Sequence, residues 1–493
     1  MDTSRSHPMH FDLPARARQE MVRDGFEPDF PPAIAAQLRQ TEHASPGYAD
    51  GADVQDLRAL LWSSIDNRES RDLDQVEVAE RLADGGVRLR IGIADVDWLV
   101  PPASPIDLHA RHNCCSVYTG VSIFPLLPEE LSTDRTSLVQ DKDRLAVVIE
   151  MDIDGDGAVT SSRVYRALTR NRAQLTYDGV GDWLEGSASV PPRVAAVEGM
   201  DAQMRLQHEV ARTLQERRRR DGAMEFESVE PRPVVEEGRI KDLEVPRDNP
   251  ARRMIENFMI SANTAMARTL EDRGIPSFQR IVRSPQRWPR MVEIAQRLGD
   301  ALPPEPDPRA LSQFLARRRA ADPAHFPDLS LSIVKLMGPG EYTVVKSAAG
   351  HVGHFGLAVY SYTHSTAPNR RYADLIVQRA VKACLAAEPA PYSEAELAEV
   401  AERCTERENA ARKVERFMRK AVAAVWMHER IGSTFDAIVT GASPKGTYVR
   451  LLKPPVEGRV VRGEQGLDVG DRTRVRLIDT DPERGYIDFE EAS

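Results

Sequence analysis

The chain has 493 residues, of which 41% are hydrophobic and 29% charged, and its formal net charge is −10. This composition is ordinary for a globular protein of roughly two to four domains, and the acidic balance argues against a uniformly basic nucleic-acid binder. No run approaches the roughly 18 apolar residues of a membrane span, and the N-terminus lacks the apolar core of a signal peptide. The four cysteines show no Cys-x-x-Cys spacing, so neither a zinc site nor a disulfide framework is indicated. We expect a cytoplasmic protein with no membrane partner.

Residues 1–52 predict a short helical extension, because PARARQEMVRD and PPAIAAQLRQ are helix-like pieces in a Pro-punctuated stretch. Strand-like alternation follows over 87–100 and 143–154. The sequence DIDGDG, from residue 152, begins like a calcium-binding EF-hand loop. The twelfth position of such a loop must be a glutamate, and here it is Arg163. A hairpin turn between two strands is therefore the better interpretation.

A long amphipathic helix is predicted in NPARRMIENFMISANTAMARTLEDRG. Asn249 suits the N-cap, Pro250 the first turn, and Gly274 the end of the helix. The apolar residues at helical spacing form one face, which comprises Ile255, Phe258, Met259, Ala262, Met266 and Leu270.

In the last hundred residues, the sequence pattern changes at residue 432 from helical to strand-like. Before it, Ser393 and Glu396 form a potential capping box, so a charged helix is predicted over 393–431, which we assign to the domain before it. After it, residues 432–493 contain short alternating strands broken by Gly and Pro. About 60 residues of this kind suit a small five-stranded barrel.

The stretch SSIDNRESRDLDQ gathers Asp66, Asp72 and Asp74 on a predicted loop directly before a strand-like run. Like charges held close together repel one another, so either water solvates these carboxylates or a cation binds them. Magnesium prefers oxygen ligands and commonly takes few carboxylates, and paired metal ions activate water in nucleases. Spacing alone favours a solvated loop but leaves both interpretations open.

Three compact arginine clusters interrupt the acidic background: ERRRRD (216–221), ARRM (251–254) and ARRRA (316–320). The guanidinium group suits phosphate because its fork donates two parallel hydrogen bonds. Each cluster alone is explained more simply as a solvated helix face, and their recurrence favours a nucleic-acid contact only modestly.

Five segments, in their order and spacing, resemble the catalytic RNB domain of the ribonuclease II/R exoribonuclease family. The resemblance covers about residues 53–493, and the C-terminal barrel resembles the OB fold of that family. The segments that carry it are SIDNRESRDLDQ, IGIADVDWLVPPASPID, SVYTGVSIFPLLPEELS, RAQLTYDGVGDWLEG and GHFGLAVYSYTHSTAPNRRYADL.

The resemblance implies an α+β catalytic domain over 53–392, in which a central sheet and surrounding helices enclose a channel, followed by the OB barrel. It also implies processive hydrolysis of single-stranded RNA from the 3′ end to 5′-mononucleotides. The implied cofactor is Mg²⁺, as one or two ions, with Mn²⁺ as a substitute. DNA is not expected as a substrate, and the sequence does not indicate an oligomeric state.

The resemblance places the metal ligands at Asp66, Asp72, Asp74 and Gln75, and the catalytic residues at Asp74 and Arg370. The family usually has a fourth Asp where this chain has Gln75, whose amide oxygen can bind a metal ion without contributing charge. Glu77 would share the Gln75 side of a strand, so compensation by Glu77 stays open. The segment Ala-Pro-Asn-Arg replaces the usual Ser-Pro-Ile-Arg around the catalytic arginine, and the guanidinium would stabilise charge on the scissile phosphate.

The RNA-binding positions implied by the resemblance are aromatic or acidic. Tyr118 and Phe226 would stack on the 3′-terminal bases, which is how single strands are bound without sequence preference. Tyr177 and Glu256 would contact ribose, whose 2′-hydroxyl distinguishes RNA from DNA. Tyr448 would be an exposed aromatic on the barrel that captures RNA.

Related enzymes often carry two cold-shock-type domains before the catalytic domain, and the residues preceding the Asp cluster here are too few for both. We therefore hypothesise an entrance that tolerates duplexes with a short 3′ overhang. The alternative function is an RNA-binding family member whose catalysis is weak or lost because of Gln75. An endonuclease or DNA-directed nuclease has no supporting feature beyond the metal chemistry.

Overall fold

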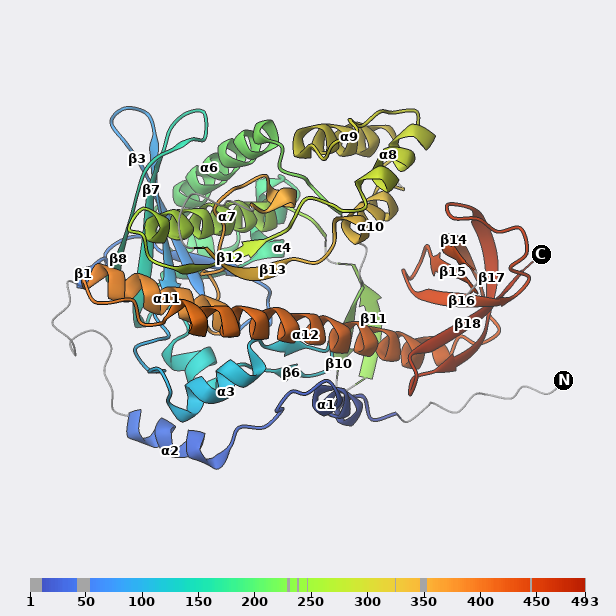
Figure 1. The fold of residues 1–493 in the computed structure, drawn as a ribbon, viewed down its shortest axis with the longest axis horizontal. Coiled ribbons are helices and arrows are strands. Elements are labelled where there is room, and N and C mark those ends of the chain that lie inside the picture. Colours follow the sequence, from blue (N-terminus) through green and yellow to red (C-terminus); the bar gives the residue numbers. More distant parts are fainter. Residues whose placement is uncertain are drawn as a thin grey trace.

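A computed structural model describes residues 11–41, 54–227, 231–236, 239–245, 247–323, 325–345, 353–443 and 446–492. A mixed sheet with surrounding helices forms one end of the molecule, a closed barrel forms the other, and one long helix runs between them (Figure 1). This architecture confirms the predicted α+β class and the C-terminal barrel.

The central sheet has seven strands in the order β1-β8-β7-β4-β3-β2-β9. Its middle pairs are antiparallel, whereas β1 and β9 at the edges pair in parallel. The strands are β1 (Val54–Asp56), β2 (Ser63–Asp66), β3 (Gln75–Arg81), β4 (Val87–Ala94), β7 (Asp143–Ile153), β8 (Val159–Arg170) and β9 (Ala173–Thr176).

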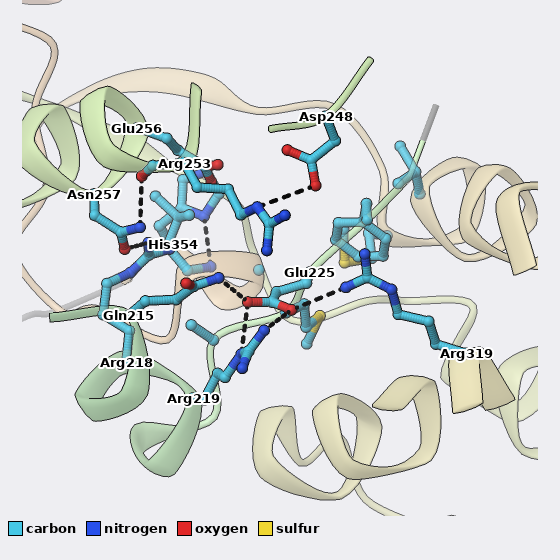
Figure 2. A pocket seen from close by; sticks show the side chains of 17 residues that line it. Gln215, Arg218, Arg219, Glu225, Asp248, Arg253, Glu256, Asn257, Arg319 and His354 are labelled. Atoms are coloured by element: carbon cyan, nitrogen blue, oxygen red, sulfur yellow. Dashed lines mark hydrogen bonds and ion pairs between the residues drawn. The ribbon is translucent and has the colours of Figure 1, made fainter. Parts of the chain in front are cut away.

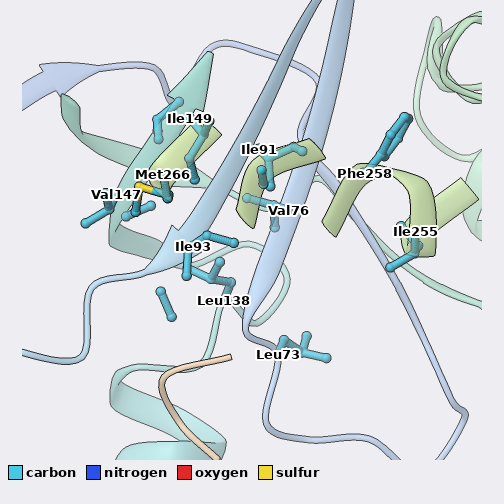
Figure 3. Packing of buried hydrophobic residues seen from close by; sticks show 14 of the residues in the cluster. Leu73, Val76, Ile91, Ile93, Leu138, Val147, Ile149, Ile255, Phe258 and Met266 are labelled. Atoms are coloured by element: carbon cyan, nitrogen blue, oxygen red, sulfur yellow. The ribbon is translucent and has the colours of Figure 1, made fainter. Parts of the chain in front are cut away.

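The main core lies between this sheet and helix α7 (Pro250–Glu271). Figure 3 shows Val76 and Ile91 of the sheet near Phe258 and Met266 of the helix. Strand β7 is buried on both faces over residues 145–151 and carries a near-continuous apolar run, whereas β3 and the first half of β4 alternate apolar and polar residues. The predicted apolar face of α7 is confirmed, and within it only Met259 is partly exposed.

The helices α1 to α6 and α11 pack around the sheet and the long α12, whereas α8, α9 and α10 pack on one another in a separate group (Figure 1). Helix α6 packs on β3, α2 on α3, and α1 along α12. Their bounds are α1 (Leu13–Arg23), α2 (Pro32–Thr41), α3 (Pro105–Asn113), α4 (Tyr177–Leu184), α5 (Pro192–Ala195), α6 (Met200–Asp221), α8 (Trp288–Arg297), α9 (Pro308–Ala321), α10 (Phe326–Met337), α11 (Tyr372–Leu385) and α12 (Glu394–His428), with a π-turn at Glu130–Arg135 and a 3₁₀ turn at Phe355–Leu357.

The caps of both predicted helices are present. The Asn249 side chain accepts a hydrogen bond from the Arg252 backbone N–H over 3.0 Å at the start of α7. Ser393 and Glu396 form the reciprocal capping box of α12, and α12 ends within a few residues of the predicted position.

The barrel closes in the order β14-β15-β16-β18-β17 and packs against the end of α12. Three two-stranded sheets complete the fold: β5–β6, β10–β11 and β12–β13. The strands outside the central sheet are β5 (Val117–Tyr118), β6 (Ile123–Phe124), β10 (Arg232–Glu236), β11 (Arg239–Glu244), β12 (Ser277–Ile281), β13 (Glu341–Val345), β14 (Thr434–Ser443), β15 (Gly446–Leu451), β16 (Glu457–Arg462), β17 (Arg472–Asp481) and β18 (Tyr486–Glu491).

The strand predicted over 87–100 ends early, at Ala94. The backbone N–H groups of Val96 and Asp97 both donate to Oε1 of Gln378 in α11, over 2.9 and 3.1 Å. A side chain from a distant helix thus replaces a neighbouring strand as the hydrogen-bond partner. By contrast, DIDGDG forms the predicted hairpin turn, in which the Asp154 side chain accepts from the Ala158 N–H.

In the part of the chain that the structure describes, no helix combines the length and apolar character needed to cross a bilayer. The four cysteines are free thiols. The boundary predicted after residue 52 lies outside the described residues, and the domain boundaries as a whole remain predictions.

Candidate active site

The predicted carboxylate cluster lies where β2 ends and β3 begins. These strands are antiparallel neighbours, so the loop between them returns Asp72, Asp74 and Gln75 to the end of β2, where Asp66 lies. Asp74 and Gln75 are buried, whereas Asp66 and Asp72 are partly exposed. The Gln75 side chain lies close enough to Asp66 to lower the pKa of that carboxyl.

Burial strongly perturbs two of these carboxylates. The pKa of Asp66 is raised to about 7, mainly by burial and also by the neighbouring Asp74 carboxylate, while Arg370 opposes the shift. Burial likewise raises the pKa of Asp74 to about 7, against the lowering effect of Arg370 and with a further contribution from Asp72. The site therefore holds several carboxylates close together in a shielded environment, which is where a bound cation is most stabilising.

Arg370 reaches this cluster from the other end of the sequence. Its Nε donates to Asp74 Oδ2 over 3.2 Å, and the backbone N–H of Asn369 donates to Asp74 Oδ1 over 3.0 Å. The Arg370 side chain is 45% exposed, whereas that of Asp74 is 1% exposed. One edge of the guanidinium is thus fixed on a buried carboxylate and the rest remains accessible.

The segment around Arg370 is held by buried polar contacts. Arg371 pairs with Asp374 through two hydrogen bonds of 2.8 Å, and Asp374 also accepts from the Ala367 N–H. Thr136 donates to the side-chain oxygen of Asn369 over 2.5 Å. These contacts fix the backbone on both sides of Arg370, and they give Asn369, where the family usually has Ile, a structural role.

The two predicted tyrosines flank the carboxylates. Tyr118 is 40% exposed, and its hydroxyl donates to Asp72 Oδ2 over 3.3 Å. Tyr177 directly follows β9, whose last residue pairs with Asp66. The guanidinium of Arg252 lies 4.5 Å from the centre of the Tyr177 ring and donates to Asn67 over 3.2 Å.

Phe226 and Glu256 line a separate cavity of about 360 Å³ beside the carboxylate site. Helix α7 connects the two places, because Arg252 contacts Asn67 next to Asp66, while Glu256, one turn further along, lines the cavity. The structure thus brings Phe226 and Glu256 together at one cavity, and Tyr118, the predicted stacking partner of Phe226, is not among the residues that line it.

The cavity is rich in arginine (Figure 2). Four arginines and three carboxylates line it: Arg218, Arg219, Arg253 and Arg319, with Glu225, Asp248 and Glu256. Glu225 holds Arg219 over 2.7 Å and Arg319 over 3.2 Å. The buried Nε atom of Arg218 has no hydrogen-bond partner among the described residues, whereas Nε of Arg253 forms an ion pair with Asp248 over 3.3 Å (Figure 2).

These four arginines come from all three clusters in the sequence, ERRRRD, ARRM and ARRRA. The interpretation of the clusters as separate solvated helix faces is therefore wrong for these residues. The repeated Arg runs are visible in the sequence, but only the packing of α6, α7 and α9 shows that these arginines line one cavity.

Tyr448 lies in the barrel rather than at the carboxylates. It is on β15, opposite Arg459, and is 41% exposed. A bidentate ion pair fixes the barrel to the helical part, since Arg450 contacts Asp328 of α10 at 2.9 and 3.0 Å. Tyr448 is therefore presented on a barrel that is anchored to the rest of the protein.

The chemistry of the cluster fits a hard divalent ion. Carboxylate and amide oxygens are the ligands that Mg²⁺ prefers, and the buried Oδ2 of Asp66 has no hydrogen-bond partner among the described residues. In the described ranges, however, no three His, Cys, Asp or Glu side chains are gathered as a metal-binding group. Binding an ion therefore requires side-chain rotation or ligands such as Gln75 and water.

Comparison with known proteins identifies the fold and family. The RNB domain matches residues 54–387, and the RNase II-type exonuclease C-terminal S1 domain matches residues 433–492. The chain belongs to the RNB-domain family. The resemblance inferred from the sequence motifs is thereby confirmed.

Ribonuclease R of Escherichia coli is 30% identical to the chain over 93% of its length, but the chain covers 60% of that protein. Ribonuclease R of Thermotoga maritima is 28% identical over 97% of the chain and 68% of that protein. The chain thus spans about three fifths to two thirds of the length of these relatives. The structure of Mycoplasma genitalium RNase R in complex with ribose methylated single-stranded RNA superposes with a TM-score of 0.87 at 21% identity, covering 98% of this chain and 78% of that one. This match establishes the same fold.

Arg252 was not among the candidate residues. Its position beside Asp66 and Tyr177 depends on the pairing of β9 with β2 and on the angle at which α7 crosses the sheet. The ARRM cluster was the available signal, although nothing in it separates Arg252 from Arg253.

Proposed function

We propose that this RNB-family protein is a divalent-metal-dependent exoribonuclease that degrades single-stranded RNA from the 3′ end to 5′-mononucleotides. The observation that carries the proposal is the contact of Arg370 with Asp74, across 296 positions of sequence, in a cluster with Asp66 and Asp72. A guanidinium fixed beside acidic metal ligands is the arrangement that phosphodiester hydrolysis requires.

The residues of the site would have separate roles in binding RNA and in hydrolysis. A bound Mg²⁺ or Mn²⁺ supplies the positive charge that activates water and neutralises the leaving oxygen. Arg370, held through Nε by Asp74, directs its remaining N–H donors at the non-bridging oxygens of the scissile phosphate. Tyr118 holds Asp72 through its hydroxyl and offers its exposed ring to a terminal base. Tyr177 and Glu256 contact ribose, which makes DNA a poor substrate.

We predict that the Arg253→Gln variant binds single-stranded RNA more weakly for all sequences. The guanidinium faces the cavity, and loss of one phosphate contact should reduce the slope of log Kd against log salt concentration by about 1. Fluorescence anisotropy with labelled RNA in chelator, over several salt concentrations, measures this slope. The exposed Arg212 of α6 provides the control, because Arg212→Gln should leave the slope unchanged. An unchanged slope in Arg253→Gln would place RNA elsewhere.

We predict that Tyr448→Ala impairs capture of long RNA but not cleavage of short RNA. Stacking of one base on an aromatic ring contributes about 1–3 kcal/mol, so KM for a long substrate should rise by about 5- to 100-fold. A substrate too short to span from the carboxylates to the barrel should keep its kcat and KM. Equal effects on both lengths would contradict a capture role.

The second candidate function is RNA binding with weak or lost catalysis. Gln75 favours it, because the resemblance calls for a fourth carboxylate at this position and a neutral amide contributes no charge. We favour hydrolysis, since Asp66, Asp72, Asp74 and Arg370 are all present in the cluster.

Tolerance of duplexes with a short 3′ overhang is a finer part of the proposal. The helices α1 and α2 pack on α12 and α3, and we propose that they form an entrance that admits such a duplex. An overhang duplex should therefore be digested into its paired region. Stalling several nucleotides before the pairing would contradict this part alone.

One assay tests the proposed function against its competitors. The full chain is incubated with 5′-labelled single-stranded RNA or DNA in Mg²⁺, in Mn²⁺ and in chelator. A ladder that shortens from the 3′ end, only with RNA and only with metal, is the expected result. RNA retention without cleavage would favour the binding protein, and internal cuts or cleavage of DNA would favour a different nuclease.

A further inference from the structure

Glu77 lies in the middle of β3 and is fully buried. Both of its carboxylate oxygens lack a hydrogen-bond partner among the residues that the structure describes. Buried carboxylates are normally paired with a cation or fully hydrogen-bonded, because a charge without compensation is strongly destabilising in the protein interior. A buried glutamate whose carboxylate has no partner therefore needs an explanation beyond packing.

The surroundings of Glu77 make its position less favourable still. Gln75 lies two residues earlier on the same side of β3, and its side chain is close enough to Asp66 to lower the pKa of that carboxyl. Asp66 is the charged group that acts on Glu77, and the Tyr177 hydroxyl is close enough to be affected by both carboxylates. Asp66 also keeps one buried oxygen without a partner in the described structure. Two nearby carboxylates thus both have buried oxygens without a hydrogen-bond partner among the described residues.

The guanidinium group beside Tyr177 is engaged elsewhere. Arg252 lies over the Tyr177 ring and donates to Asn67, and no arginine or lysine contributes to the electrostatic environment of Glu77. Within the described residues, the protein itself therefore supplies no positive charge to balance this carboxylate.

A bound divalent cation would balance the charge of these carboxylates and provide a partner for their free oxygens. Mg²⁺ commonly binds through one or two carboxylates and keeps several waters. Asp66 and Glu77 offer two carboxylates with free buried oxygens, and Gln75 between them offers an amide oxygen. The four acidic side chains Asp66, Asp72, Asp74 and Glu77 would then provide the charge that three aspartates and Gln75 do not.

We propose that Glu77 is a metal ligand of this site, which binds a divalent cation together with Asp66 and Gln75 and supplies the carboxylate missing at position 75. This inference rests on the proposed function, in which the cluster binds divalent ions. It assigns a ligand role to a strand residue that lies outside the Asp-rich loop.

Binding of Mn²⁺ to the full chain tests the proposal without any RNA. Electron paramagnetic resonance of free Mn²⁺, in titrations of protein, measures affinity directly. Glu77→Gln keeps the shape of the side chain and should weaken binding of one ion by about 10- to 100-fold. Glu80→Gln on the same strand is the matched control, because Glu80 is exposed and paired with Arg90, and it should bind Mn²⁺ like the unmodified chain.

Rescue gives the sharper readout. If Glu77 compensates for Gln75, the double variant Gln75→Asp/Glu77→Gln should regain the lost Mn²⁺ affinity. Unchanged affinity in Glu77→Gln, or a loss that Gln75→Asp does not restore, would overturn the proposal. If Glu77→Gln does not fold, Glu77→Asp replaces it, and affinity equal to that of the unmodified chain would then overturn it.

The outcome is separable from that of the proposed function. A chain that binds Mn²⁺ through Glu77 but leaves RNA intact would support the ligand role and contradict the nuclease. If the unmodified chain degrades RNA and the Glu77→Gln variant binds Mn²⁺ normally, the nuclease function would be supported and the ligand role of Glu77 contradicted.

Discussion

Asp74→Asn should lower the single-turnover rate of RNA cleavage by at least about 10²- to 10³-fold, the cost of removing one preorganised electrostatic contact. Asp74 is the carboxylate that both joins the metal cluster and holds Arg370 through Nε. The amide oxygen can still accept the Asn369 N–H, but the amide nitrogen would face Arg370 and displace it. Affinity for RNA, measured in chelator, should change little.

Asp201→Asn is the matched control for this variant, because Asp201 is an exposed residue in the first turn of α6. Its cleavage rate should equal that of the unmodified chain. If Asp74→Asn also cleaved at the unmodified rate, the carboxylate cluster would not be the site of hydrolysis.

The neighbouring arginines Arg370 and Arg371 should give opposite phenotypes. Arg371 forms a bidentate pair with Asp374, whose side chain is fully buried. Removal of one partner of such a pair leaves an uncompensated buried charge, so Arg371→Ala should reduce the free energy of unfolding by about 3 kcal/mol. Arg370→Ala should affect stability less, since its side chain is half-exposed, and should instead lower the cleavage rate by about 10²- to 10³-fold.

Urea unfolding followed by circular dichroism, together with single-turnover cleavage of labelled RNA, measures both quantities for both variants. Arg370→Lys adds a further test, because lysine keeps the charge but cannot donate as a planar fork. It should remain strongly impaired in cleavage and close to the unmodified chain in stability. A large loss of stability in Arg370→Ala with normal cleavage would show that Arg370 is structural.

The sequence allowed the helices and the barrel to be predicted because their signals are local. Asn249 and the pair Ser393 and Glu396 are caps whose hydrogen bonds span three residues. The early end of β4 could not be predicted in this way, because the backbone N–H groups of Val96 and Asp97 bind Gln378, nearly 300 residues away.

The candidate site likewise contains residues that the sequence indicated and features that only the packed structure shows. Asp66, Asp72 and Asp74 are close in sequence, and the motif around Arg370 indicated its place, so these residues were predicted together. The arginine cavity was not predicted, since its residues lie on separate helices and each run resembles a solvated face. The isolation of Glu77 could not be predicted either, because the absence of a partner is a property of the packed structure.

The most direct test of the account is a crystal structure of the full chain with Mn²⁺, in which anomalous scattering locates the ions. The account predicts a peak bound by oxygens of Asp66, Asp72 and Asp74, on the side of the cluster that faces the guanidinium of Arg370. Anomalous peaks only elsewhere in the molecule, with these three carboxylates bound to protein groups or water, would contradict it.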